Sequence, residues 1–392
     1  MEIPLKQILM CILGLIFIGS VSSQNLTLIN ADNISQAKNH QHLLETELNL
    51  LYQLADTTLA MQPTSVMDKG VVASSNDKHD YMSRGPYWWP DPEKVDGLPY
   101  IRRDGEVNPE IALISDHKNL VQVINAVDLL SLAYFYSENE KYAQKATKLL
   151  EVWFLDSATR MNPNLNFGQA IPGRTEGRGI GIIETRDFGY LVDGVSLIAQ
   201  SEAWTEQHQT QMKQWVSDYL DWLINSQHGK DEAVNGNNHT TWYFVQTIAM
   251  ALFTEQTSLA KKLQKRGVKL IVDQQIEDDG KQPEELARTR TWDYSTMNLL
   301  AIYYFAILSE KLGEPIWDYE ERKIKKALDF LLPYVSEEND WDYPQIKKMN
   351  RYRLFPVLKI AANHYSEGIY DTVLLHQYNP KESNLLIGLR YP

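Results

Sequence analysis

Apolar residues recur at helical spacing through most of this chain, whereas strictly alternating stretches, which would indicate strands, are scarce. The clearest helical patterns cover roughly residues 36–60, 118–137, 187–203, 239–254, 256–276, 293–312 and 319–333, with further apolar faces from Tyr142 to Trp153 and from Met212 to Leu223. Most of these predicted helices follow one another after short joins, and successive antiparallel hairpins of this kind can close into a ring. Because no repeat of fixed period is present, a regular solenoid is disfavoured. We expect an all-α fold, an (α/α) toroid or incomplete barrel of helical hairpins.

Two long stretches interrupt the helical pattern. Residues 61–117 are rich in Pro and aromatic side chains, and residues 156–186 combine several Gly with several Arg. Loops of this length in a compact domain are usually functional or disordered, and disordered segments rarely carry so many aromatics. We therefore expect ordered loops that line a cleft; the alternative is irregular packing over the helices. No Ser- or Pro-rich linker divides the chain, so one domain is expected over residues 24–392.

The first 23 residues have the pattern of a secretory signal peptide. Lys6 supplies the positive start, residues 8–18 form a short apolar run, and Val21-Ser22-Ser23 is a small-residue cleavage site. The run is short for a membrane span, and we expect no span later in the chain. Cys11 lies within this segment but lacks the small preceding residue of a lipoprotein cysteine, so we expect a soluble exported protein and not a lipid-anchored one. Because Cys11 is also the only cysteine, we expect no disulfide and no cysteine-bound metal in the mature chain. The expected location is the periplasm or the cell exterior.

The charge balance restricts the class of partner. The formal net charge of -13 argues against nonspecific binding of nucleic acid. It is compatible with an anionic sugar polymer where cations gather locally. The chain has neither HExxH nor a phosphate-loop signature, and its nine His residues are scattered, so we expect neither a metal nor an organic cofactor.

A helix start with reactive side chains is predicted at residues 237–242, NNHTTW. Gly236 predicts a turn, and the apolar pattern then begins near Asn238 or His239. The free N–H groups and partial positive charge of a helix N-terminus favour an anion. They also disfavour protonation of a nearby imidazole, so His239 could accept a proton. Asn238 alone could be only the helix cap; beside Asn237 and His239 we interpret it as part of a site.

A second such segment, residues 284–294, opens another helix near Trp292 or Asp293. Arg288 could bind a carboxylate through two parallel hydrogen bonds. Tyr294 follows near the helix start, where a cationic neighbour would lower the pKa of its phenol. The alternative is that Arg288 and Arg290 pair with neighbouring carboxylates (Glu284, Glu285 or Asp293), and that Tyr294 is an interior aromatic.

Aromatic side chains and arginines are interleaved in the first long loop. Trp and Tyr faces can stack on sugar rings while their polar edges stay hydrogen-bonded. The loop residues expected to contact a substrate are Tyr81, Arg84, Tyr87, Trp88, Trp89, Arg102 and Arg103. Three residues of the helix starts complete the expected binding set: Asn237, Trp242 and Arg290.

The residues of the two helix starts suit a reaction that holds a carboxylate, takes a carbon-bound proton and protonates a departing oxygen. Glycoside hydrolysis usually needs a pair of carboxyl groups, and Glu184, Asp187 and Asp293 could supply one. A noncatalytic carbohydrate-binding protein would account for the aromatic loop but would give the His, Arg and Tyr residues no particular role. These two alternatives remain open from the residues alone.

The same segments resemble the alginate lyase superfamily of polysaccharide lyases, whose folds are helical toroids. The resemblance lies in NNHTTW at 237–242, ELARTRTWDY at 285–294, and KHDYMSRGPYWWPDP at 78–92 continued by GLPYIRRDGEVNPE at 97–110. It extends in order over much of the mature chain. It is strongest to bacterial members of polysaccharide lyase family 38 and more distant to family 5.

The resemblance implies cleavage of a 1,4-linked uronic-acid polymer, most simply alginate, by β-elimination without a cofactor. By the same resemblance, Asn238 and Arg288 would neutralise the uronate carboxylate. Arg290 is a second candidate, because the spacing from Arg288 to Tyr294 is shorter than in family 5. His239 would be the base or would tune the local charge. Tyr294 would protonate the leaving oxygen, and could also be the base where proton and leaving group share one face.

Overall fold

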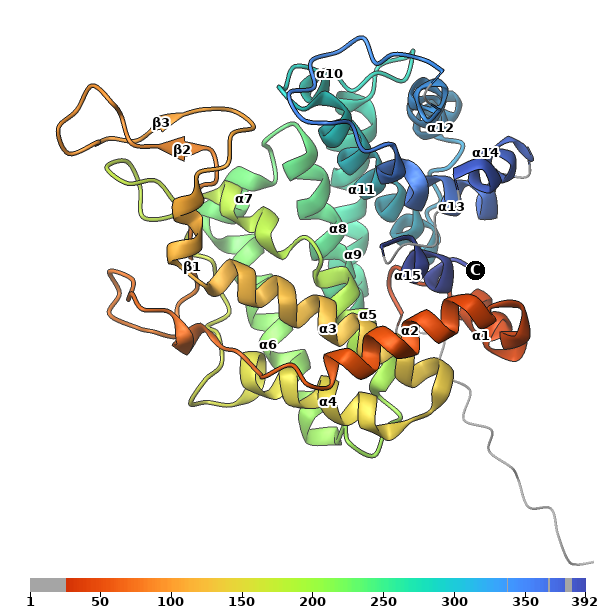
Figure 1. Ribbon diagram of the computed structural model, residues 1–392, viewed down its shortest axis with the longest axis horizontal. Helices are drawn as coiled ribbons and strands as arrows, with labels where there is room; N and C mark the ends of the chain where they lie inside the picture. Colours follow the sequence, from red (N-terminus) through yellow and green to blue (C-terminus); the bar gives the residue numbers. More distant parts are fainter. Residues whose placement is uncertain (1–25, 337, 366, 378–382) are drawn as a thin grey trace, which may run out of the picture.

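The structure is a computed structural model that describes residues 26–336, 338–365, 367–377 and 383–392 (Figure 1). The expected signal peptide, residues 1–23, and Cys11 within it lie outside the described residues. The described chain is mainly helical, with short strands only in its loops. The all-α toroid expected from the helical periodicity is confirmed.

The predicted helices are present with shifted ends, whereas the helices over 227–232, 283–286, 355–364, 369–377 and 383–390 were not predicted. In chain order, the helices are α1 (Ala31–Asn39), α2 (Glu45–Thr58), α3 (Asp116–Ser137), α4 (Glu140–Leu150), α5 (Phe188–Ile198), α6 (Glu206–Asn225), α7 (Gln227–Glu232), α8 (Asn238–Phe253), α9 (Thr257–Val268), α10 (Pro283–Leu286), α11 (Thr291–Lys311), α12 (Tyr319–Leu331), α13 (Phe355–His364), α14 (Ile369–Gln377) and α15 (Ser383–Arg390). The pattern expected over 36–60 is divided between α1 and α2. A π-helical turn, Lys269–Asp273, follows α9 and completes the pattern expected over 256–276.

Helices that follow one another in the chain pack side by side around one core (Figure 1). α3 packs against α2, α4 and α5; α5 packs against α8; and α8 also packs against α9 and α11. The two ends of the described chain meet, because α15 packs against α1, α2 and α13. The buried apolar side chains form a single cluster that extends from Leu26 to Tyr391.

Helices α8 and α11 are buried on most of their sides. Their apolar residues therefore occupy most faces rather than one stripe. A polar network also joins them, because Thr241 of α8 and Asn298 of α11 both donate to the Oε1 atom of Gln275, at 3.0 and 3.1 Å. This contact fixes the two helices whose first turns carry the expected reactive residues.

Helix α3 corrects one expectation from the sequence. By length and mean hydropathy it is apolar enough to cross a membrane, although the sequence reading foresaw no such stretch after the signal segment. Of the apolar 18-residue stretch within this helix, 67% is buried within the fold. A core helix that packs against several neighbours is apolar for the same reason as a membrane helix, since both avoid water.

The two long loops are ordered and are joined to each other. Strand β1 (Met82–Arg84) of the first loop pairs in parallel with β4 (Phe167–Ala170) of the second. Within the first loop, β2 (Trp88–Trp89) and β3 (Ile101–Arg102) form a short antiparallel hairpin that projects from the helices (Figure 1). Segments about eighty residues apart are thus held as one unit beside α3 and α7.

A buried ion pair anchors the start of the first loop. The Nζ atom of Lys69 lies 3.0 Å from the Oδ2 atom of Asp116, and both side chains are fully buried. Lys69 also donates to the carbonyls of Val66 and Lys78, each at 2.7 Å, while Asp116 accepts the backbone N–H of Met82 at 2.9 Å. Burial raises the pKa of Asp116 to about 6 against the opposing effect of Lys69. The pair therefore ties the loop and β1 to the first turn of α3.

We predict that Lys69→Met lowers the free energy of unfolding by roughly 3–5 kcal/mol, because it leaves the Asp116 carboxylate buried without its partner. Denaturant-induced unfolding at neutral pH measures the change. The matched control is Lys141→Met, which breaks the exposed pair between Lys141 and Asp56 and should alter stability little. A Lys69→Met protein as stable as the wild type would contradict the anchoring role.

Candidate active site

The first turn of α8 presents the residues of the NNHTTW segment. Gly236 adopts a positive φ of +87°, which lets the chain turn directly before the helix. The side chain of Asn237 caps the helix by accepting the backbone N–H of His239 at 3.0 Å. Asn237 is therefore the capping residue, and Asn238, which was the alternative candidate for that role, is the first residue of the helix.

His239 has a buried carboxylate as its partner. Its Nδ1 atom lies 2.7 Å from the Oε1 atom of Glu232, the last residue of α7. The Glu232 side chain is 1% exposed and that of His239 is 15% exposed. A carboxylate at this position favours the tautomer with hydrogen on Nδ1, which leaves Nε2 of a neutral imidazole free to accept a proton. The negative charge of Glu232 would also stabilise the imidazolium once it forms.

A second buried carboxylate, Glu285 of α10, joins the two predicted segments. Its Oε1 atom accepts the backbone N–H of Asn238 at 2.6 Å, and both carboxylate oxygens accept the Asn238 amide Nδ2 at 3.0 Å. Burial raises the pKa of Glu285, and the hydrogen bonds from Asn238 together with the charges of Arg288 and His239 oppose that rise. Glu285 thus lies within electrostatic range of both the histidine and the arginine.

The contact with Glu285 restricts what Asn238 can offer to a ligand. Its amide nitrogen is engaged by Glu285, and its Oδ1 atom is buried without a partner in the described part of the chain. Donation from Asn238 to a substrate carboxylate would require Glu285 to release that nitrogen.

Arg288 is paired with a residue of the first long loop. Its Nε and Nη2 atoms donate to the two carboxylate oxygens of Asp104 at 3.2 and 2.8 Å. Although burial raises the pKa of Asp104, the hydrogen bonds from Arg288 and Thr289 hold it well below its usual value. Arg290 pairs with Asp293 at 2.8 Å, as the alternative interpretation foresaw. Both guanidiniums therefore already have carboxylate partners.

Tyr294 lies directly beneath Arg288. The centre of the guanidinium is 3.8 Å from the centroid of the Tyr294 ring, and the Tyr294 hydroxyl is 2.7 Å from that of Tyr87 in the first loop. The expected lowering of the phenol pKa is wrong: burial raises the pKa of Tyr294, the nearby Tyr87 raises it further, and Arg288 offsets only part of this. The phenol is therefore protonated at neutral pH, which suits a proton donor.

Two expected binding residues are interior residues instead. The Tyr81 ring is fully buried, and its hydroxyl donates to Glu184 at 2.7 Å. The Trp242 side chain is 3% exposed and packs edge-on against Tyr304 at a centroid distance of 6.0 Å. Both were predicted as substrate contacts because aromatic rings suit sugars, but the core of a helical toroid needs large aromatic side chains for the same apolar surface.

The hairpin formed by β2 and β3 keeps its aromatic and cationic side chains at least partly accessible. Trp88 pairs across the hairpin with Arg102, and the Arg103 guanidinium lies 5.3 Å from the centroid of the Trp89 ring. Tyr87, directly before Trp88, reaches the hydroxyl of Tyr294. The hairpin therefore adjoins the candidate active site.

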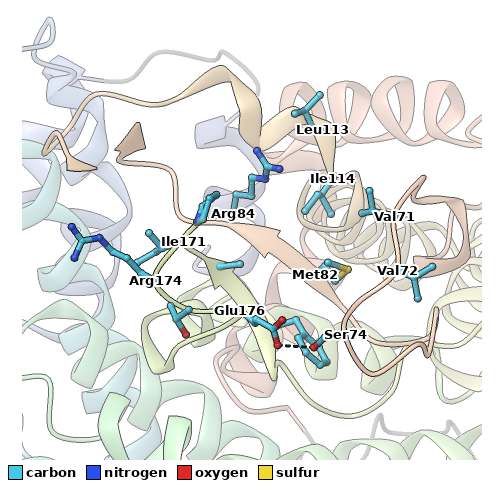
Figure 2. A pocket seen from close by; sticks show the side chains of 15 residues that line it. Val71, Val72, Ser74, Met82, Arg84, Leu113, Ile114, Ile171, Arg174 and Glu176 are labelled. Carbon is cyan, nitrogen blue, oxygen red and sulfur yellow. Dashed lines mark hydrogen bonds between the residues drawn. The ribbon is translucent and has the colours of Figure 1, made fainter. Parts of the chain in front are cut away.

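Arg84 lies at a different place. It forms an ion pair with Glu110 at 2.9 Å and lines a hollow of about 760 Å³ beside β1 and β4. Figure 2 shows this hollow, with apolar side chains such as Val71 and Met82 around it. The four expected catalytic residues do not line this hollow.

The comparisons with known proteins agree with this geometry. The sequence model of the alginate lyase family matches residues 65–341. The solved structure of an alginate lyase from Bacteroides ovatus has 38% sequence identity and a TM-score of 0.89, covering 94% of this chain and 99% of that one. This chain belongs to the alginate lyase family.

More distant members of the alginate lyases share the fold alone. Alginate lyase A1-III from Sphingomonas species A1 has 13% identity and a TM-score of 0.54, covering 95% of this chain and 97% of that one. A histidine-to-alanine variant of A1-III, solved with a tetrasaccharide, has 14% identity and a TM-score of 0.59 over the same shares. A comparison with curated proteins finds no match.

Membership of the alginate lyase family makes this protein a polysaccharide lyase. The hydrolase and the noncatalytic binding protein are therefore set aside. The carboxylate proposed for a hydrolase also has another role here, because the Oε2 atom of Glu184 accepts both Tyr81 and Ser83, at 2.7 and 2.6 Å. Asp187 lies beside Arg186 at 3.8 Å.

Sequence reasoning missed the carboxylates of this lyase that hold its reactive residues. Glu232 has no distinguishing neighbours in the sequence. Asp104 lies in a segment that carries the resemblance but was given no role, and Glu285 was considered only as a possible partner of an arginine. The only signal for Glu232 was its position seven residues before His239, and this spacing alone does not indicate a contact. Only the folded structure selects these three acids from the 51 Asp and Glu residues of the chain.

We predict that Glu232→Gln lowers kcat of the lyase roughly 100-fold, because the neutral amide stabilises neither the Nδ1–H tautomer nor the imidazolium. Initial rates on a uronan measure the loss, and thermal unfolding checks that the variant is folded. The control, Glu138→Gln, removes an equal charge from the exposed pair with Lys38 and should leave kcat unchanged. A folded Glu232→Gln enzyme with the wild-type kcat would contradict the role of this carboxylate.

Proposed function

We propose that this polysaccharide lyase cleaves a 1,4-linked uronic-acid polymer, most simply alginate, by β-elimination. The observation that carries the proposal is the clustering of two reactive units around Glu285: His239 with Glu232, and Tyr294 beneath Arg288. The likeness to the alginate lyase from Bacteroides ovatus supports alginate as the substrate. Export, from the signal segment at residues 1–23, is part of the same proposal because the polymer is too large to cross a membrane unaided.

The reaction needs one proton acceptor and one proton donor. The C5 hydrogen of a uronate is weakly acidic because it is alpha to the carboxylate. Its removal places the electron pair into a C4–C5 double bond, breaks the bond from C4 to the glycosidic oxygen, and leaves that oxygen to be protonated. His239 accepts the C5 proton at Nε2, and the carboxylate of Glu232 stabilises the positive charge that forms on the imidazole.

Tyr294 supplies the proton to the leaving oxygen. Its raised pKa keeps the phenol protonated until the oxygen departs, and the guanidinium over its ring stabilises the phenolate that forms. The same raised pKa makes Tyr294 a weak candidate for the base, so we assign that role to His239.

The lyase function is tested by incubating the protein with polymannuronate, polyguluronate, glucuronan and a glycosaminoglycan. We expect ultraviolet absorbance from unsaturated uronate ends on at least one of them. New reducing ends without that absorbance would indicate hydrolysis instead. No product from any uronan would refute the proposal.

We predict that Tyr294→Phe lowers kcat by about 10²- to 10⁴-fold, the range that a general acid contributes, while affinity for the polymer is retained. Turnover is followed by the absorbance of the product and affinity by calorimetry. The matched control is Tyr87→Phe, which removes the other hydroxyl of the 2.7 Å pair and should have a far smaller effect on kcat. Equal losses in the two variants would contradict the assignment of Tyr294 as the donor.

A further inference from the structure

Two arginines of the second long loop lie over one tryptophan of the first. The Arg174 guanidinium is 5.2 Å from the centroid of the Trp88 ring, and that of Arg178 is 5.8 Å from it. We call them the Trp88 arginines. Each is fixed by backbone: Arg174 donates to the carbonyl of Tyr100 at 2.8 Å, and Arg178 to the carbonyl of Gln169 at 3.1 Å.

Neither of the Trp88 arginines has a carboxylate partner. Among the residues that the structure describes, no ion pair involves either guanidinium, although Arg288 and Arg290 each have one. The second bond of Arg178 also goes to a neutral group, the Oε1 atom of Gln169, at 2.8 Å.

Charge around Arg178 is correspondingly unbalanced. Burial lowers its pKa to about 10, and the positive charge of Arg102 adds to this effect, while the charges of Glu232 and Glu184 oppose it. The guanidinium is still protonated at neutral pH. An added anion would relieve both the burial and the repulsion from Arg102, so the position favours a negatively charged ligand.

The Trp88 arginines are connected to the candidate active site in two ways, through α7 and through Tyr87. Arg178 directly precedes a 3₁₀ segment, Gly179–Thr185, that packs against α7, and the last residue of α7 is the Glu232 that holds His239. Trp88 directly follows Tyr87, whose hydroxyl meets that of Tyr294. Figure 2 shows Arg174 on the side of the hollow opposite Val72, extended away from its apolar lining.

We propose that Arg174 and Arg178 form a carboxylate-binding subsite for a uronate unit of the polymer other than the one that is cleaved. The inference rests on the proposed lyase function, and it names the residues that read the charge of the neighbouring sugar. The Nε and Nη2 atoms of Arg178 are bonded to Gln169, and Nη1 makes no such bond to any described residue. Arg174 is exposed and lies over the ring of Trp88, as Arg178 does. Guanidiniums suit this role because their paired N–H groups match the two oxygens of a carboxylate.

The test compares uronate tetramers with carboxyl-reduced tetramers, which have the same sugars without charge. Dissociation constants are measured by calorimetry for Arg174→Gln, for Arg178→Lys and for their combination, in the Tyr294→Phe background, where turnover is slow. Arg178→Lys keeps the charge but loses the paired N–H groups. Arg174 is exposed, so Arg174→Gln should not disturb folding. The matched control is Arg322→Gln on α12, which removes one exposed arginine far along the chain.

We expect each variant of the Trp88 arginines to weaken binding of the charged tetramer about tenfold or more, with no change for the carboxyl-reduced tetramer and none in the control. In the active enzyme the same changes should raise KM and leave kcat nearly constant, because the contact is made equally before and during the reaction. Wild-type affinity in Arg174→Gln and Arg178→Lys, or an equal loss for both tetramers, would overturn the subsite.

The outcomes for the subsite and for the lyase function are separable. Charge-dependent binding through the Trp88 arginines without unsaturated products would support the subsite and refute the lyase function. Unsaturated products with unchanged binding in the variants would do the reverse. Absence of both binding and products on every uronan would refute the two together.

Discussion

The carboxylate of Glu285 is the contact on which the candidate active site depends. It is almost fully buried, and a buried carboxylate is tolerated only where hydrogen bonds and positive charge surround it. Asn238 supplies the hydrogen bonds and Arg288 the positive charge, to which His239 adds once it has accepted a proton. The need to satisfy one buried acid thus holds the first turn of α8 against the segment before α11, and it places side chains about fifty residues apart in one cluster.

The remaining charged residues near the site are of two kinds, those paired with an oppositely charged or ionisable side chain and those held only by neutral groups. His239 faces Glu232, and Arg288 faces Asp104, so these groups are oriented before any ligand arrives. Such orientation favours reaction chemistry, where a group must be in place at the moment charge develops. The Trp88 arginines are positioned by backbone carbonyls and ring contacts instead, which leaves their charge available to an anionic polymer.

Burial reversed one expectation about reactivity. A cation beside Tyr294 was expected to lower the pKa of its phenol, and Arg288 does lie over the ring. The loss of water around the hydroxyl raises the pKa more than Arg288 lowers it, and the neighbouring Tyr87 adds to the rise. Tyr294 is therefore better suited to give a proton than to take one. The same balance between water and neighbours explains why Tyr81 is a core residue and not a sugar platform.

The sequence by itself determined the all-α toroid, most of its longer helices, the two helix starts and the family, because helical periodicity and short motifs are local properties of the chain. It also predicted two ordered loops from their aromatic content. Only the tertiary structure decided which acids hold the reactive groups, which aromatics are interior, and which arginines have no carboxylate partner among the described residues. Those outcomes depend on distances between residues far apart in sequence and on the exclusion of water, and neither quantity is encoded in the spacing of neighbouring residues.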